Sequence, residues 1–172
     1  MTALVKAKTG PLAGYTVMPI DMVKFMAFKQ ACYAAHVAYG FGSKDPNPGS
    51  GKIGFTEIDC SGYVRTLLMF AAGGAMSAFP DGSYTQGEWL AAKGFKPTAA
   101  SNGANLDGCL RCYVHHPDTL DETGHIFLTI NGHTIESFGG HGPGERRWNA
   151  MLHSGHTLDA LASVGYVLAV LP

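Results

Sequence analysis

The sequence predicts an α+β domain, with helices in its first half and an antiparallel sheet in its second half. Apolar residues recur at helical spacing between residues 21 and 92, and short segments of strand-like composition follow from residue 109 onward. The chain has 172 residues, 46% of them hydrophobic, which is enough for one substantial core but too little for two ordinary domains. We therefore expect a single domain over residues 1–172.

The first helix is expected to begin after Asp21, whose side chain can cap it, and to end near Gly40. Cys32, in its middle, is expected to be a core residue. An apolar-rich stripe at three-to-four spacing predicts its buried face, formed by Val23, Met26, Gln30, Ala34 and Val37. Residues 40–54 are dense in Gly, Pro, Ser and Asp and predict a surface loop.

The second helix is predicted to have Asp59 as its N-cap and Cys60 in its first turn. The Gly73-Gly74 pair is expected to end it. Its buried stripe is predicted to contain Val64, Leu67, Leu68 and Ala71. A third, short helix is predicted over residues 84–92, between a proline and a glycine.

Four segments in the second half predict strands: residues 109–115, 125–130, 134–138 and 164–171. Asn131-Gly132, between the second and third of these, is the pair favoured in type I′ hairpin turns. The last segment is expected to close the same antiparallel sheet.

Charge and hydropathy argue against several classes of partner. With 12 basic and 13 acidic residues the formal net charge is -1, so no positive field favours nucleic acid or an anionic membrane. Residues 1–14 lack the apolar core of a secretory signal, and the most apolar stretch, residues 63–79, is interrupted and too short to span a bilayer. We expect a protein made in the cytoplasm without a Sec signal, with no nucleic-acid partner and no membrane insertion.

Cys60 and His125 are the candidates for chemistry. A thiol attacks a carbonyl as its thiolate, which the first turn of a helix favours through its exposed N–H groups. His125 opens a predicted strand directly after Gly124, where its imidazole can take the thiol proton and later protonate a leaving amine. Backbone N–H groups at the helix start can bind the oxyanion. The pair indicates a cysteine hydrolase.

Short motifs around these residues resemble a known family. Residues 59–64, Asp-Cys-Ser-Gly-Tyr-Val, match the nucleophile motif of the NlpC family of cell-wall cysteine peptidases, a papain-like group. Residues 39–42 resemble the tyrosine-containing turn before that nucleophile, and residues 124–128 resemble the glycine-histidine-aliphatic strand that carries the base. Residues 79–86 are similar to the proline-to-glutamine segment of the family. The resemblance covers about residues 23–148.

The resemblance implies a papain-like NlpC-type fold, in which the nucleophile helix packs on the C-terminal antiparallel sheet. It implies hydrolysis of an amide bond in the peptide stem of peptidoglycan, commonly between γ-D-glutamate and a diamino acid, with no metal or cofactor. Tyr39, Asp59, Ser61 and His141 are the expected oxyanion or substrate-binding residues. The implied setting is a phage lysin, a tail-associated hydrolase or an injected antibacterial effector. Such a protein is delivered to the cell wall, acts as a monomer and has an immunity or delivery protein as partner.

The third catalytic residue departs from the commonest family pattern. Family enzymes often carry a second histidine on the strand after the hairpin, and the matching position here is Glu136. A carboxylate can accept the ring N–H and stabilise the imidazolium, so we expect Cys60, His125 and Glu136 to act together. His141, on a glycine-rich segment, is the alternative.

Two other functions stay open on the sequence. Cys109 and Cys112, with His115 or His116, could form a zinc-stabilised binding module, although adjacent histidines on a strand point to opposite faces. The same fold could also serve an acyltransferase or an amidase acting on another amide. Arg146, Arg147 and Trp148 are expected either to line a substrate groove or to be a solvated charge pair beside a core tryptophan.

Overall fold

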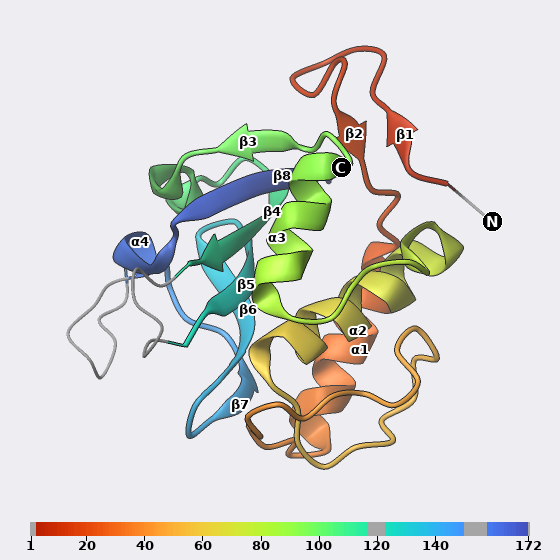
Figure 1. Ribbon diagram of the computed structural model, residues 1–172, viewed down its shortest axis with the longest axis vertical. Coiled ribbons are helices and arrows are strands. Elements are labelled where there is room, and N and C mark those ends of the chain that lie inside the picture. The colour runs from red at the N-terminus through yellow and green to blue at the C-terminus, as the bar shows by residue number, and fades with distance from the viewer. Residues whose placement is uncertain (1–2, 117–122, 150–157, 172) are drawn as a thin grey trace.

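The computed structural model describes residues 3–116, 123–149 and 158–171 (Figure 1). The predicted domain limits, residues 1 and 172, both lie outside the described residues. The main helices are α1 (Met22–Ala34), α2 (Cys60–Ala72) and α3 (Ser83–Ala92), followed along the chain by the short helix α4 (Leu158–Leu161). Two 3-10 turns, η1 (Gly73–Met76) and η2 (Ala100–Ala104), follow α2 and β3. In the part of the chain that the structure describes, no helix is long and apolar enough to cross a membrane.

The second half forms a six-stranded antiparallel sheet in the order β3-β8-β4-β5-β6-β7. Its strands are β3 (Lys96–Thr98), β4 (Cys109–His115), β5 (His125–Ile130), β6 (His133–Phe138), β7 (Gly142–Gly144) and β8 (Val164–Val170). The four predicted strands are confirmed within one residue at each end. Asn131 and Gly132 have φ of 48° and 74°, which confirms the predicted type I′ hairpin.

Four short strands were not predicted, because none of them is long enough to show a periodic pattern. β1 (Val5–Lys6) and β2 (Thr16–Val17) form a separate two-stranded sheet, and β3 and β7 are three residues each. β7 is Gly-Pro-Gly, a composition that argues against a strand. It pairs with β6 at the edge of the sheet, where a proline is tolerated.

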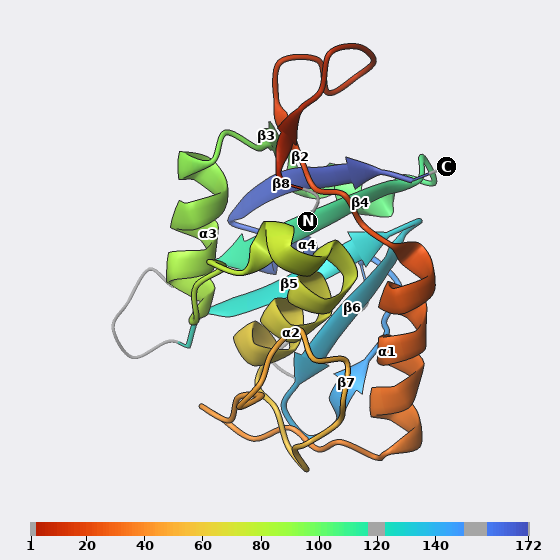
Figure 2. The same ribbon diagram turned by 90° about the vertical axis from the view of Figure 1, so that its right-hand side faces the viewer.

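The three main helices, α1, α2 and α3, cover one face of the sheet. Figure 2 shows α2 in front of β5 and β6, with α1 on one side of it and α3 on the other. The larger core lies between these helices and the sheet, and includes Leu67 and Leu68 of α2 and Ile126 and Leu128 of β5. A smaller cluster on the other face is formed by Tyr113, Phe127, Trp148 and Leu158. The α+β arrangement of N-terminal helices packed on a C-terminal antiparallel sheet is as predicted.

The first helix is correct in position but its predicted buried face is wrong. Asp21 caps α1 by accepting the amides of Val23 and Lys24, yet Val23 is 81% exposed and Met26 41% exposed. The side chains that α1 buries are Phe25, Phe28, Lys29 and Cys32, which also follow helical spacing. Two phenylalanines offer more apolar area than Val and Met, so they take the core side, and Cys32 is in the core as expected.

The predicted end of α1 near Gly40 is also wrong. The helix ends at Ala34, and His36 then adopts a left-handed φ of 51°. Val37 is buried outside the helix, and Ala38 bridges Glu57 in a parallel pairing. The chain from residue 37 therefore runs alongside the segment that leads into Cys60. Residues 40–54 contain no helix or strand, as predicted.

The corrected face of α1 leads to a stability prediction. Phe28→Ala is expected to lower the free energy of unfolding by about 3–5 kcal/mol, because a 2%-exposed ring that packs 5.7 Å from the Phe70 ring leaves a cavity. Val23→Ala, on the exposed side, should change it by no more than about 0.5 kcal/mol. Urea unfolding of both variants checks the pair. Equal losses would contradict this orientation of α1.

Candidate functional site

The start of α2 positions the candidate nucleophile. Asp59 caps the helix by accepting the Gly62 amide at 2.7 Å, and Cys60 is the first helical residue, 7% exposed. The Tyr63 amide donates to the Asp59 carbonyl. Of the amides in this first turn, those of Cys60 and Ser61 are left as candidates to bind an oxyanion.

The sheet brings His125 and Glu136 to this helix start. His125 opens β5 and Glu136 lies on β6, where antiparallel pairing and strand alternation place them on the same face. The His125 Nε2 atom is 2.7 Å from Glu136 Oε2. Ser137 Oγ donates to the Ile58 carbonyl at 2.7 Å, which ties β6 to the turn before Cys60.

Cys60 lies close enough to His125 for its sulfur to raise the pKa of the imidazole. Because Nε2 is engaged by Glu136, Nδ1 is the ring nitrogen left for the sulfur. The structure therefore brings the three predicted catalytic residues together in the order thiol, imidazole, carboxylate. This is the arrangement that a nucleophile, a base and an orienting group require.

Electrostatic interactions favour the charged forms of both His125 and Glu136. Burial by itself would lower the pKa of His125, but hydrogen bonds to Cys60 and Glu136 and the negative charges of those groups raise it to about 9. Burial by itself would raise the pKa of Glu136, but hydrogen bonds from His125 and Arg146 and their positive charges hold it well below its usual range. At neutral pH the site therefore holds an imidazolium against a carboxylate.

These shifts predict how stability depends on pH. The raised pKa of His125 stabilises the fold fully below its unfolded value of 6.5, and this contribution is lost as pH rises through about 9. The lowered pKa of Glu136 stabilises the fold fully above pH 4.5, and this stabilisation is lost at strongly acid pH. The parent should therefore lose on the order of 3 kcal/mol of unfolding free energy between pH 6.5 and 9.5.

Urea unfolding across that pH range checks this expectation. His125→Gln should flatten the alkaline decline, whereas His133→Gln, which removes an exposed histidine of β6, should leave it in place. A parent curve that is flat from pH 6.5 to 9.5 would contradict the charged pair.

Two further residues, Thr134 and Arg146, hold Glu136, and neither was predicted to do so. Glu136 is fully buried, and its Oε1 accepts from Thr134 Oγ1 at 2.6 Å and from Arg146 Nε at 2.9 Å. Arg146 also donates from a terminal nitrogen to Oε2 at 2.7 Å. Arg146 was expected to line a groove or be solvated, while Trp148 packs in the smaller core beside Tyr113 and Phe127. A carboxylate that is buried in a strand requires a cation as its partner. A glutamate predicted in such a position, with arginines nearby in the sequence, was the signal that could have predicted the Arg146 contact.

Asp59 and Ser61, expected at substrate-binding positions, are buried beside Cys60 and bonded to protein groups. Lys44 from the preceding loop contacts the Asp59 carboxylate and lies 2.8 Å from Ser61 Oγ. Gln86 of α3 is fully buried and donates to the Ser61 carbonyl at 2.9 Å. These contacts fix the first turn of α2 from both sides and so hold Cys60 in place.

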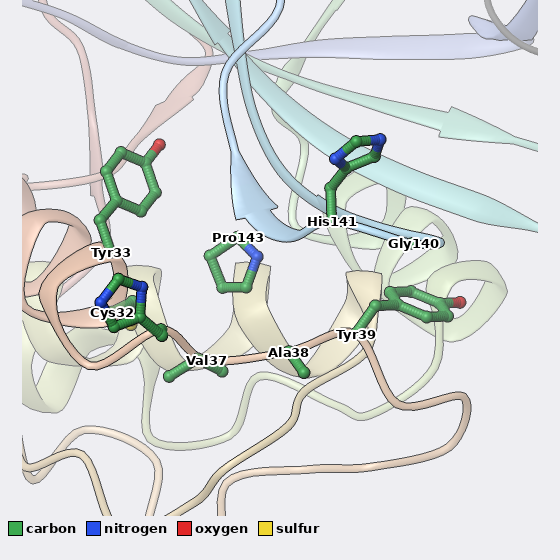
Figure 3. Close-up of a pocket in the computed structure, with 9 residues that line it drawn as sticks. Cys32, Tyr33, Val37, Ala38, Tyr39, Gly140, His141 and Pro143 are labelled. Atoms are coloured by element: carbon green, nitrogen blue, oxygen red, sulfur yellow. The ribbon is translucent and has the colours of Figure 1, made fainter.

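Tyr39 and His141 lie at a cavity next to the three residues. The cavity has a volume of about 490 Å³ and is formed by the end of α1, residues 36–39 and the turn between β6 and β7. Figure 3 shows Tyr39 at one end, its ring pointing away from Tyr33, with His141 on the facing turn. Burial, and then the negative charges of Cys60 and Asp59, raise the pKa of Tyr39, so this side chain is within electrostatic range of both groups.

None of Cys60, His125 and Glu136 is among the residues that line this cavity. Tyr39 lies between the cavity and these three residues, so the cavity borders the site but does not contain it. The His141 ring packs 4.9 Å from Phe138, whereas Glu136 is in hydrogen-bond contact with His125. The geometry favours Glu136 over His141 as the partner of the base.

The residues of the zinc alternative do not converge. Cys109 and Cys112 are three positions apart on β4 and so point to opposite faces, Cys112 into the larger core. Over residues 3–116, 123–149 and 158–171, no three His, Cys, Asp or Glu side chains are placed to share a metal ion. All four cysteines are unbridged.

No protein-family model matches this sequence, and no curated protein matches it at a significant level. The functional argument therefore rests on the motif around Cys60 and on the geometry of Cys60, His125 and Glu136.

Proposed function

We propose that this protein is a cysteine peptidase that hydrolyses an amide bond in the peptide stems of peptidoglycan. The observation that carries the proposal is the placement of Cys60, at the head of α2, beside His125, whose ring is hydrogen-bonded to the buried Glu136. The NlpC-like motif at residues 59–64 supplies the substrate class, with the γ-D-glutamyl-diamino acid bond as the expected point of cleavage.

The chemistry follows from the positions of the three groups. The Cys60 thiolate attacks the amide carbonyl, and the oxyanion that forms is bound by first-turn amides of α2. The His125 imidazolium donates its proton from Nδ1 to the leaving amine, the C–N bond breaks, and a thioester to Cys60 remains. The neutral imidazole then takes a proton from water, whose oxygen attacks the thioester and releases the acid and the thiol.

The proposal extends to the fold and to the site of action. The order of a nucleophile helix, a strand with the base and a neighbouring strand with its partner supports an NlpC-type, papain-like arrangement. We place its action at the bacterial cell wall after delivery, as a monomeric phage lysin, tail-associated hydrolase or injected effector. An effector of this kind would be neutralised by an immunity protein.

Digestion of purified sacculi tests the proposal. Sacculi with diaminopimelate stems and sacculi with lysine stems are incubated with the protein, and soluble fragments are identified by mass spectrometry. We expect fragments with an intact glycan and a new free amine on the diamino acid, and none above the buffer level from Cys60→Ala. Cleavage confined to the glycan, or equal release by both proteins, would end the proposal.

A further inference from the structure

We infer that Arg146 is a positioning residue of this reaction, whose guanidinium keeps Glu136 a charged acceptor for His125 through the steps in which His125 is neutral. The inference rests on the proposed cysteine-hydrolase chemistry. It adds a fourth member to the predicted three, one that never touches the substrate.

The geometry makes Arg146 a fixed clamp. Its Nε and one terminal nitrogen donate to the two oxygens of Glu136 at 2.9 and 2.7 Å, the parallel pairing that fits a guanidinium to a carboxylate. Its backbone is bonded to Thr134 in both directions, with distances of 3.0 and 2.8 Å. Its guanidinium also lies 4.1 Å from the centre of the Phe138 ring. Arg146 is therefore held along its whole length by β6.

The charges around Glu136 explain why this clamp matters for catalysis. Once Cys60 has passed its proton to His125, the charges of the thiolate, the imidazolium, Glu136 and Arg146 sum to zero. In the thioester intermediate the sulfur and the imidazole are both neutral, so Arg146 is the charge left to balance a fully buried carboxylate. Two titratable side chains of α1 lie on this side of the sheet but supply no free positive charge to Glu136. Tyr33 is a neutral phenol, and Lys29 is paired with Glu145.

Without Arg146, Glu136 would hold a proton in that intermediate. A protonated carboxyl would donate to Nε2 of His125, and the ring would then carry its hydrogen on Nδ1, which faces Cys60. That tautomer cannot accept the proton of the attacking water. Thioester hydrolysis should slow more than thioester formation, and the acyl-enzyme should accumulate.

The loss of a positive charge also changes the pH profile in a defined direction. The pair of His125 and Glu136 would hold its shared proton more tightly, so the alkaline limb of the activity profile moves to higher pH. A cation in contact with a carboxylate changes such a titration by about 1–3 pH units. A residue needed only for folding would lower the amplitude and leave the limb where it is.

The test uses Arg146→Met, which removes the charge, and Arg146→Lys, which keeps it but loses the paired geometry. Lys93→Met is the matched control, because Lys93 is an exposed cation at the end of α3 and the charge change is the same. The rate of Cys60 alkylation by iodoacetamide is measured from pH 4 to 11, together with kcat, KM and the acyl-enzyme fraction on muropeptides.

For Arg146→Met we expect an alkaline inflection at least about 1 unit higher than in the parent, a kcat at pH 7 about 10-fold lower or more, and an accumulated thioester. Lys93→Met should match the parent. An unmoved inflection in Arg146→Met would overturn the inference. If Arg146→Met does not fold, Arg146→Lys decides: a lower kcat at unchanged KM supports the role, and a parent kcat overturns it.

Alkylation needs no peptidoglycan, so the two proposals can fail separately. A shifted inflection in a protein that releases nothing from sacculi would remove the proposed substrate and keep the role of Arg146. If the protein cleaves stem peptides but the alkaline inflection does not depend on Arg146, the proposed substrate is kept and the role of Arg146 is removed.

Discussion

Cys60→Ala is expected to reduce the release of stem-peptide fragments by about 10⁴-fold or more, because the variant can form no thioester and loses the covalent route entirely. Removal of one methyl-sized sulfur at a helix start should leave the fold intact, since Asp59, Lys44 and Gln86 still hold the turn. Initial rates on soluble muropeptides, normalised to folded protein by circular dichroism, measure the effect. A variant that retains more than about 1% of the parent rate would contradict a nucleophilic role.

Cys109→Ala is the matched control, because Cys109 is the other cysteine with an exposed edge and lies on β4, away from α2. Burial raises the pKa of Cys32 to about 12, and burial also raises the pKa of Cys112 and Cys109. The thiolate is the form that alkylating agents modify. Limiting iodoacetamide should therefore label Cys60 first, and loss of activity should follow that single modification. Inactivation by label on Cys109 would argue for a different site.

The order of elements could be predicted from the sequence because each long element carries its own local pattern. Asp59 as a cap, the stripe of α2 and the Asn131-Gly132 turn are features that need no knowledge of the rest of the chain. The face of α1 could not be predicted in this way, since two apolar stripes on one helix compete and only packing against α2 selects between them. Edge strand β7 depends on pairing with β6 and has no local pattern at all.

The residues of the candidate site also divide into those with a local sequence pattern and those that depend on tertiary contacts. Cys60 and His125 sit in short motifs, and Glu136 follows from the position after the hairpin. Arg146 is separated from Glu136 by the turn that leads into β7 and back, and its role depends on a contact that only the folded sheet creates. Lys44 reaches Asp59 from a loop without regular structure, so its position has no periodic pattern to predict it.

Glu136→Gln is expected to lower kcat by about 10²–10⁴-fold, the range expected when the group that orients a catalytic imidazole loses its charge. The fully buried carboxylate accepts from His125, Thr134 and Arg146, and an amide can accept at one oxygen only. Its NH₂ group would face donors, so His125 loses the acceptor that keeps Nδ1 turned to the sulfur. Because Arg146 is left without its counter-charge, the unfolding free energy should also fall by about 3–5 kcal/mol.

Glu145→Gln separates catalysis from stability in this prediction. Glu145 also pairs with a buried cation, Lys29 of α1, but it is not bonded to His125. Because the Glu145 side chain is 40% exposed, its replacement should cost less stability than Glu136→Gln, while kcat stays within about threefold of the parent at a temperature where both variants are folded. Comparable kcat values for the two glutamine variants would mean that Glu136 serves the fold alone. If kcat falls in His141→Ala but not in Glu136→Gln, the orienting role belongs to His141, in the turn between β6 and β7.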